Sequence, residues 1–272
     1  MPNYLEDMGR TSFKPYNSSK VAIFAGAGLS AESGLSTFRD NEGLWTKYNT
    51  AEVCQINTYH QNKDKVLQFY NEVKKSISLA QPNLAHIAIA KLQKEFPNDI
   101  LVVTSNVDDL LEKAGCVNVL HVHGDCEHLS CTHCFHRFYI GSAVYDIPDN
   151  LKCPSCGRYK KLKPGIVFFG EQSPAYPFMF DGFANEDITH RVIIGTTLQV
   201  NPPHSFSLDL EGKRYYIDQN PQMENKPFFD SIIQGSATTE VPLLMHTIRT
   251  ELLGLNKWKI KKAPEGAFLF AC

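Results

Sequence analysis

Short apolar runs that recur along the chain constrain its fold more than any other feature. The first, 20–24 (KVAIF), runs into a glycine turn, which is typical of a buried strand in a parallel sheet. Further runs of this type are 100–104 (ILVVT), 119–122 (VLHV), 192–195 (VIIG) and 214–217 (RYYI). Helical patterns lie between several of them, at 83–96 and 108–114. Strands that alternate with helices predict an α/β fold built on a parallel sheet.

Two segments interrupt this rhythm. Residues 40–80 are mostly helical in pattern, and residues 125–163 are polar and rich in cysteine and histidine. We expect them to combine into a small second domain, a helical module plus a zinc-binding module, while 19–39, 81–124 and 164–256 form the sheet domain. The polar stretch 1–18 is predicted to be a flexible arm, and 257–272 a C-terminal tail.

Composition excludes several classes of protein. The chain has 272 residues, of which 43% are apolar, and its formal net charge is −2. We therefore expect a packed core and neither a nucleic-acid-binding nor a membrane-binding surface. The N-terminus lacks the basic-then-apolar order of a signal peptide, so we expect a cytoplasmic protein, and a monomer.

Four of the eight cysteines form two tight pairs. Cys131, Cys134, Cys153 and Cys156 have the spacing C-x₂-C-x₁₈-C-x₂-C, which falls within the range of a tetrahedral zinc site. Because protein ligands fill all four positions, the predicted Zn²⁺ is structural, with one ion per chain. The alternatives are two disulfides, a nucleic-acid-binding ribbon, or a histidine (His128, His133 or His136) in place of one cysteine. The remaining cysteines (Cys54, Cys116, Cys126 and Cys272) are predicted to be inert thiols.

The glycine turn after the first run has the pattern G-x-G-x-x-G/A. Gly26, Ala27 and Gly28 would let backbone N–H groups approach a pyrophosphate at a helix N-terminus. A plain structural turn is the alternative. The acidic residue that a dehydrogenase carries about twenty positions later is missing. Arg39, soon after the turn, is either a cofactor-binding cation or a surface residue.

Polar residues follow two other predicted strands. Thr104–Asp108 (TSNVD) lies at the carboxyl end of one strand, the edge where open α/β sheets bind ligands. Asp108 could instead cap the next helix. His121 and His123 flank the end of another strand; they could form a metal pair, fill structural roles, or place an imidazole base in the cleft.

Taken together, these segments resemble the sirtuin family. The matching segments are GAGLSAESGLSTFRD, TSNVDDLLEKAG, VHGD, the two C-x-x-C pairs, KPGIVFFGE, GTTLQV and IDQNP, in the family's order over roughly 20–222. The resemblance implies a Rossmann-like domain with a smaller domain of a zinc ribbon and a helical module. It also implies that NAD and an acylated lysine of a protein substrate meet in the cleft between them.

Roles carried over from the resemblance assign most of the candidate residues. His123 is the implied general base, and Asn106, Val107 and Asp108 the implied nicotinamide pocket. The implied phosphate contacts are Gly26, Ala27 and Gly28, and the implied adenosine contacts are Gly195, Thr196, Thr197 and Asp218. Phe38 and Arg39 are implied to line the flexible cofactor loop. Implied substrate contacts are Tyr70, Val167, Phe168 and Gly170.

The implied reaction releases nicotinamide when the acyl oxygen attacks the ribose. His123 then takes a proton from the ribose hydroxyls, so that one of them attacks the acyl carbon. The products are free lysine, nicotinamide and acyl-ADP-ribose.

Four positions depart from the family pattern. Ala25 replaces Thr before the glycine turn, and Ser36 replaces Pro in the cofactor loop. Ser105 replaces the Gln that contacts the nicotinamide ribose in the family. The serine side chain is too short to reach the ribose equally well. Asp218 replaces Asn, and its carboxylate can still accept from ribose hydroxyls.

The acyl group implied is acetyl or a longer neutral chain. Family members that remove succinyl or malonyl groups have an Arg three residues after the Tyr that corresponds to Tyr70, where this chain has Val73. Lys74, at the next position, is a candidate substitute cation without the bidentate geometry of Arg.

An NAD-dependent protein lysine deacylase is thus the predicted function. A mono-ADP-ribosyltransferase or NAD glycohydrolase on the same fold is the alternative that Ser105 motivates. A non-catalytic zinc- and nucleotide-binding module and a hydride-transferring dehydrogenase are the remaining ones.

Overall fold

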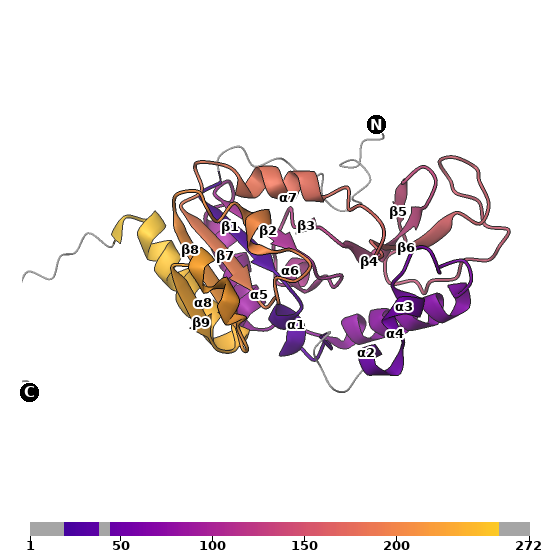
Figure 1. Ribbon diagram of the computed structural model, residues 1–272, viewed down its shortest axis with the longest axis horizontal. Coiled ribbons are helices and arrows are strands. Elements are labelled where there is room, and N and C mark those ends of the chain that lie inside the picture. Colours follow the sequence, from indigo (N-terminus) through magenta and orange to yellow (C-terminus); the bar gives the residue numbers. More distant parts are fainter. Residues whose placement is uncertain (1–18, 38–43, 256–272) are drawn as a thin grey trace, which may run out of the picture.

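The computed structural model describes residues 19–37 and 44–255 (Figure 1). The predicted arm 1–18, the predicted tail 257–272 and the cofactor-loop residues Phe38 and Arg39 lie outside the described residues. Among the described helices, none is long and apolar enough to cross a membrane.

A parallel sheet forms the centre of the larger domain. Its strand order is β3-β2-β1-β7-β8-β9, and every neighbouring pair is parallel. The strands are β1 (Val21–Ala25), β2 (Ile100–Thr104), β3 (Leu120–His121), β7 (His190–Ile194), β8 (Lys213–Asp218) and β9 (Ser231–Gln234). The predicted α/β fold is confirmed, and each of the five predicted strands is present. The sixth, β9, has only two apolar residues (SIIQ) and lies at the sheet edge, so its sequence carried no clear signal.

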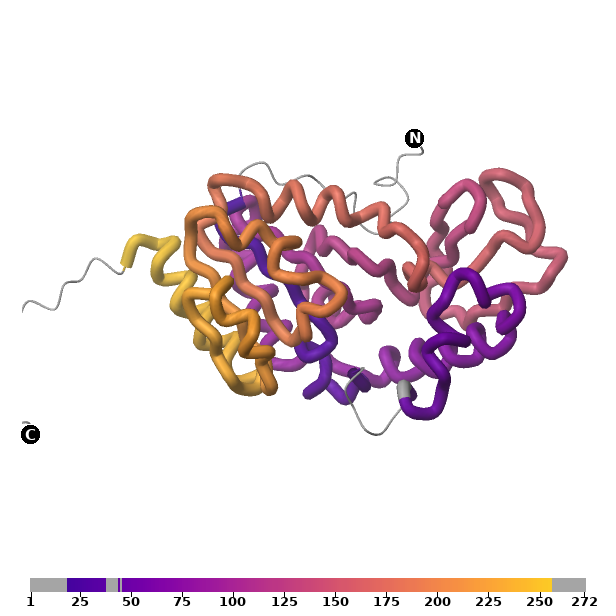
Figure 2. Tube along the Cα trace, in the orientation of Figure 1, coloured from indigo at the N-terminus to yellow at the C-terminus, as the bar shows by residue number. Residues whose placement is uncertain are grey.

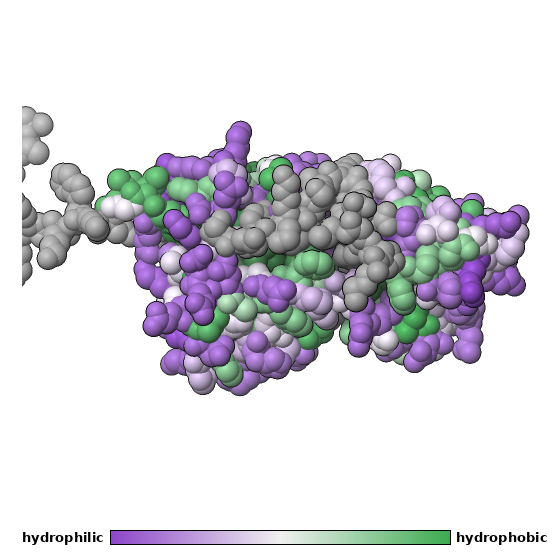
Figure 3. Space-filling view, turned by 90° about the horizontal axis from the view of Figure 1, so that it is seen from above, coloured by the Kyte–Doolittle hydropathy of each residue, from purple (hydrophilic) through white to green (hydrophobic). Residues whose placement is uncertain are grey.

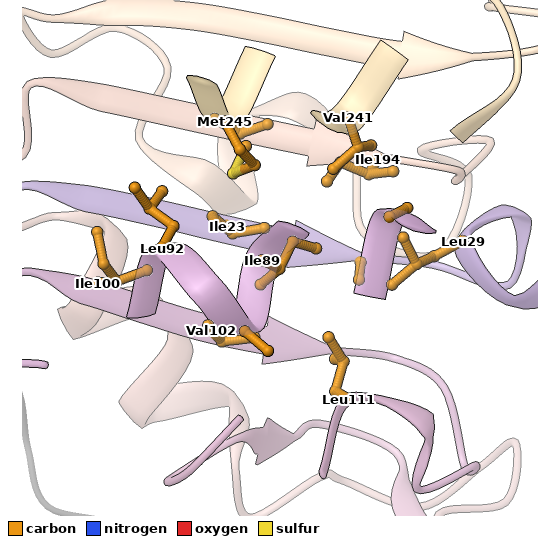
Figure 4. Close-up of a cluster of buried hydrophobic side chains, with 14 of the residues drawn as sticks. Ile23, Leu29, Ile89, Leu92, Ile100, Val102, Leu111, Ile194, Val241 and Met245 are labelled. Carbon is orange, nitrogen blue, oxygen red and sulfur yellow. The ribbon is translucent and has the colours of Figure 1, made fainter. Parts of the chain in front are cut away.

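Helices cover both faces of this sheet. On one face, α5 (Leu84–Glu95) and α8 (Ala237–Leu252) pack over Ile23, Val102 and Ile194 (Figure 4). On the other face lie α7 (Tyr176–Phe183) and a 3₁₀ turn, η1 (Pro203–Phe206). The three central strands are buried along their whole length, which is why their sequences are continuously apolar. Burying each large aliphatic side chain contributes roughly 1.5–3 kcal/mol.

Two shorter helices and a second 3₁₀ turn complete this domain. They are α1 (Gly28–Ala31), α6 (Leu110–Lys113) and η2 (Met223–Phe228). Helix α6 is shorter than the predicted 108–114 because Asp108 and Asp109 form its entrance and Gly115, at a φ of +108°, ends it.

The smaller domain combines helices with an antiparallel sheet. Its helices are α2 (Leu44–Lys47), α3 (Thr50–Val53) and α4 (Lys63–Leu79). Its strands are β4 (Gly124–Cys131), β5 (Arg137–Tyr139) and β6 (Leu162–Ile166), in the order β5-β4-β6. Figure 2 shows residues 44–80 and 125–163 side by side at one end of the molecule. The limits of the two domains given above stay a prediction.

Hydrogen bonds join the two inserted segments. The Tyr59 hydroxyl donates to the Leu162 carbonyl at 2.9 Å, and the side chain of Asn71 makes two bonds with the backbone of Tyr145. A shared apolar cluster that includes Phe69, Leu129 and Phe168 lies beneath these contacts. Hydrophilic residues are spread over much of the surface that Figure 3 presents, as expected when apolar groups fill internal clusters.

Candidate active-site cleft

A cavity of about 850 Å³ is lined by residues of both domains. It extends from the carboxyl ends of β1, β2, β7 and β8 to helix α4 and the end of β6. Its lining includes every predicted cofactor, catalytic and substrate residue that the structure describes: Gly26, Ala27, Gly28, Tyr70, Ser105, Asn106, Val107, Asp108, His123, Val167, Phe168, Gly170, Gly195, Thr196, Thr197 and Asp218. Segments far apart in the sequence therefore meet in one cleft.

Glycines let the backbones after β1 and β7 touch at this cleft. A Cβ on Gly26 would lie 2.6 Å from the Gly195 oxygen, and one on Gly28 would lie 2.6 Å from the Gly195 Cα. Gly195 also has a φ of +61°. The strand order reverses at β1, and in open α/β sheets the crevice at such a reversal is the ligand site. Because Gly26, Gly28 and Gly195 have no side chains, backbone N–H groups can approach a pyrophosphate here, and these residues therefore fit a dinucleotide.

The polar segment after β2 is held by a buried network around Ser30. The Ser30 hydroxyl donates to Asp108 Oδ2 at 3.0 Å and accepts from Asn106 Nδ2 at 3.2 Å. Asp108 Oδ1 accepts from the Leu110 N–H at 3.1 Å. Asp108 thus bonds to the first residue of α6, whose N-cap is Asp109, while its other oxygen is bonded to Ser30, and the residue also lines the cavity. Burial raises the pKa of Asp108, although these hydrogen bonds oppose the shift.

His86 belongs to the same network, and sequence reasoning missed both it and Ser30. Its Nδ1 accepts from the Asn83 N–H, so Nε2 carries the proton and donates to Ser30 Oγ at 3.3 Å. Burial lowers the pKa of His86 to about 4, which keeps the ring neutral. The available signal was a histidine three residues after an N-cap asparagine, on an otherwise apolar helix face.

His123 lies just beyond β3 and faces the start of α7. Its Nε2 is 2.9 Å from the Tyr176 hydroxyl, and the ring also has a hydrogen bond with the backbone of Ser105. Burial lowers the pKa of His123 below its ordinary value, although the Ser105 bond opposes the shift. The imidazole is thus held neutral in the cleft, the form a general base needs.

His121, two residues earlier, has a different environment. Its Nδ1 bonds to the Asn106 carbonyl at 2.9 Å and its Nε2 to Glu112 at 2.8 Å. Burial lowers its pKa, but the Glu112 carboxylate outweighs burial and raises the pKa to about 9. Since both of its nitrogens are occupied, His121 does not form a metal pair with His123.

The small-domain side of the cleft is apolar. The rings of Tyr70 and Phe168 stack with their centroids 5.6 Å apart, and the Tyr70 hydroxyl lies 3.7 Å from Cys54 Sγ. Val73 lines the cavity here, whereas Lys74 donates to the Gly141 carbonyl at 2.8 Å and lies over the Tyr145 ring. Lys74 is not among the lining residues, so the cation considered as a substitute is directed elsewhere.

The segment after β6 is fixed from beneath by a buried ion pair. Lys163 Nζ lies 3.0 Å from Glu171, whose carboxylate also accepts from the Phe168 N–H at 2.8 Å. The Val167 N–H donates to the His123 carbonyl at 2.8 Å. The predicted substrate segment and the predicted base are therefore joined directly.

Three of the departures from the family pattern, Ser36, Ser105 and Asp218, line the cavity. The Ser105 hydroxyl faces the Ala25 carbonyl at 3.5 Å, so only its backbone supports His123. Asp218 lines the cavity, and its Oδ1 accepts from the Asn220 N–H at 2.8 Å.

The four paired cysteines converge in the small domain. All their sulfur atoms lie within 4.8 Å of one another, with Cys131 and Cys156 3.8 Å apart and Cys134 and Cys153 3.7 Å apart. A tetrahedral zinc with bonds of about 2.3 Å requires sulfur separations of about 3.8 Å. A disulfide requires about 2.05 Å. The sulfur geometry therefore fits Zn²⁺ and not two disulfides.

Comparisons with known proteins agree with this geometry. Residues 26–202 match the Sir2 family. The chain is 44% identical over 160 residues to an NAD-dependent protein deacylase of Campylobacter jejuni, covering 59% of this chain and 67% of that protein. It is 36% identical to an NAD-dependent protein deacylase of Bdellovibrio bacteriovorus, and that match covers 82% of this chain and 93% of that protein.

Solved structures give the same result. A Sir2 homologue bound to ADP-ribose superimposes with a TM-score of 0.73 at 31% identity, covering 89% of this chain and 96% of that one. A Sir2 homologue bound to NAD superimposes with a TM-score of 0.72 at 31% identity, covering 88% of this chain and 93% of that one. Together with the site geometry, these matches show that the chain belongs to the sirtuin (Sir2) family.

Proposed function

We propose that the chain is an NAD-dependent protein deacylase that removes acyl groups from lysine side chains. The observation that supports this most strongly is the cavity in which the glycine turn, the Asn106–Asp108 segment, His123 and an apolar wall from the small domain converge. Relatives of this chain bear the name NAD-dependent protein deacylase, and Sir2 homologues bind NAD and ADP-ribose in solved structures.

The sheet side of the cleft would hold NAD. Gly26, Ala27 and Gly28 would receive the pyrophosphate, with Gly195, Thr196, Thr197 and Asp218 around the adenosine half. Asn106 and Asp108, fixed by Ser30, would hold the nicotinamide ring, with Val107 and Ser105 beside it. Bound NAD supplies a ribosyl carbon that the acyl oxygen can attack as nicotinamide leaves.

His123 would act as the general base of the second stage. Its neutral ring can take a proton from a ribose hydroxyl, which frees that oxygen to attack the acyl carbon. The lowered pKa of His123 supports this role, because the ring stays unprotonated below the ordinary titration range of histidine.

We also propose that Cys131, Cys134, Cys153 and Cys156 hold one structural Zn²⁺. Their sulfur separations and the spacing of the two pairs support it. The expectations of a cytoplasmic, monomeric protein without nucleic-acid or membrane partners stay predictions.

The apolar wall of the cavity formed by Tyr70, Val73 and Phe168 would favour acetyl or longer neutral acyl groups over succinyl. Val73 lines the cavity, while Lys74 bonds elsewhere. At equal peptide concentration, deacetylation should therefore exceed desuccinylation. Val73→Arg should raise desuccinylation relative to deacetylation, and faster desuccinylation by the parent would contradict this preference.

The decisive experiment is incubation with NAD and an acetyl-lysine peptide, with products followed by mass spectrometry. We expect free lysine peptide, nicotinamide and acetyl-ADP-ribose in equal amounts. If the parent cleaves NAD or labels a protein without deacylating the peptide, the hydrolase or transferase alternative replaces this proposal. If NAD is unchanged, the non-catalytic alternative holds.

A further inference from the structure

Tyr176 touches the nitrogen that the reaction would use. It is the first residue of α7, and its hydroxyl lies 2.9 Å from His123 Nε2. The two rings meet edge-on, with centroids 6.0 Å apart at 77°. Tyr176 lines the cavity, yet it has no part in the motifs from which the site was predicted.

The direction of this hydrogen bond follows from the rest of the ring. The Ser105 backbone bond raises the pKa of His123, so the ring donates to that carbonyl through its other nitrogen, Nδ1. In the neutral ring Nε2 is then the acceptor, and the Tyr176 hydroxyl donates to it. Tyr176 thus favours the tautomer in which Nε2 can accept a proton.

The tyrosine is held in place from two sides. Its ring stacks on Phe180 with centroids 5.7 Å apart. The Ser173 hydroxyl donates to the Val122 carbonyl and accepts from the Ala175 N–H at 3.2 Å. The start of α7 is therefore bonded to the residue that immediately precedes His123, so the hydroxyl and the imidazole move together.

We propose that Tyr176 is a positioning residue for the base His123, a role that rests on the function proposed above. In the free protein its hydroxyl fixes the ring and the tautomer. When the co-substrate binds, a ribose hydroxyl transfers its proton to Nε2. The Tyr176 hydroxyl keeps its own proton and turns to accept a hydrogen bond from the imidazolium N–H that forms, which stabilises that imidazolium.

The first test separates the two stages of the reaction. Tyr176→Phe should slow deacylation about 3–10-fold, the size expected for one lost hydrogen bond. Nicotinamide exchange should be unchanged, because it depends on Asn106 and Asp108. Tyr159→Phe, which removes a hydroxyl from a half-exposed ring in the zinc module, should change neither rate.

A double-mutant cycle tests whether the tyrosine acts through the histidine. If it does, Tyr176→Phe causes no further loss of deacylation in a His123→Ala protein. An unchanged rate in the single variant would overturn the proposal, as would equal losses of exchange and deacylation, which indicate a distorted cleft.

A spectroscopic measurement tests the contact without catalysis. In the free protein labelled with ¹⁵N-histidine, Tyr176→Phe should shift the His123 Nε2 resonance and lower the population of the Nδ1–H tautomer. Unchanged signals would reject the proposal. If the parent protein does not deacylate, the proposed function fails, and this measurement alone decides whether Tyr176 positions His123.

Discussion

The sheet domain and the small domain are stabilised by different kinds of groups. Strands β1, β2 and β7 are buried along their whole length between two apolar clusters. In the small domain, β4 alternates between buried and half-buried residues, and one apolar cluster includes the sulfurs of the paired cysteines. Two large apolar clusters form most of the core of the first domain, which nevertheless buries Arg191 of β7 and the Ser30 network. The second domain depends more on polar groups and, as proposed, on a metal.

The small domain also contains buried ion pairs. Asp125 contacts Arg137 at 2.8 Å and His128 at 2.6 Å, and Lys163 contacts Glu171 at 3.0 Å. Burial raises the pKa of Asp125, but its two partners outweigh burial and lower it. Desolvation offsets much of the energy of such pairs, so they fix geometry more than they stabilise the fold.

The cleft lies where these two kinds of structure meet. Its sheet side consists of backbone turns at the ends of buried strands and of the hydrogen-bond network around Ser30. Its other side belongs to the small domain. The contrast predicts that loss of the metal disrupts the small-domain side of the cleft, whereas substitutions in the sheet domain disrupt the other side.

Loss of the paired thiols should have the largest effect. Cys153→Ser should lower zinc content to near zero and destabilise the small domain by on the order of 5 kcal/mol, because zinc binding and folding are coupled. Calorimetry should then show two unfolding transitions, with that of the sheet domain nearly unchanged. Cys116→Ala, a buried cysteine of the sheet domain, is the matched control and should keep one zinc per chain. If the parent protein contains no zinc and still unfolds as before, the small domain does not depend on a metal and the contrast between the two domains is wrong.

Replacement of the proposed base His123 should have the next largest effect, and it should change the rate of deacylation without changing stability. His123→Ala should slow deacylation by about 10²–10⁴-fold, since a general base typically contributes that much. Zinc content and nicotinamide exchange should persist. The acidic limb of kcat/KM in the parent should lie below pH 6.5, because the pKa of His123 is lowered. His246→Ala, on the exposed side of α8, should behave as the parent, and full activity of His123→Ala would exclude it as the base.

A glycine substitution tests the sheet side of the cleft. Gly195→Ala should destabilise the protein by about 3 kcal/mol, because its Cβ would meet Leu29 N at 2.6 Å at a φ of +61°. Gly254→Ala has a similar φ of +68° with no atom within 4 Å, so it isolates the backbone term of about 1 kcal/mol. Urea unfolding measures both, and equal losses would mean that the close backbone contact contributes nothing.

The smallest effect concerns the ion pair beside the cleft. The pKa of His121 is raised to about 9 in the folded state, so its pairing with Glu112 stabilises the protein fully below about pH 6.5 and the gain is lost as pH rises through 9. Glu112→Gln should therefore cost about 1–2 kcal/mol at pH 6 and much less at pH 9.5. A pH-independent difference in urea unfolding would show that His121 is not charged.

Much of the fold and site could be predicted from local patterns. Buried strands are recognisable as apolar runs, the glycine turn by its spacing, and the paired cysteines by theirs, since each depends on neighbours in the sequence. Strand β9 was missed because an edge strand of two apolar residues has no such pattern.

Sequence alone determined the family, the strand–turn–helix start of the sheet and the candidate ligand set of the metal. Only tertiary structure decided which polar side chains meet. In the folded chain His123 lies in the cleft with a neutral ring, whereas His121 pairs with Glu112. Lys74 bonds to the Gly141 carbonyl and not into the cavity, and the Tyr176 hydroxyl contacts the proposed base. The physical reason is that a side chain's direction and pKa depend on elements far along the chain that pack against it, and no local pattern encodes those contacts.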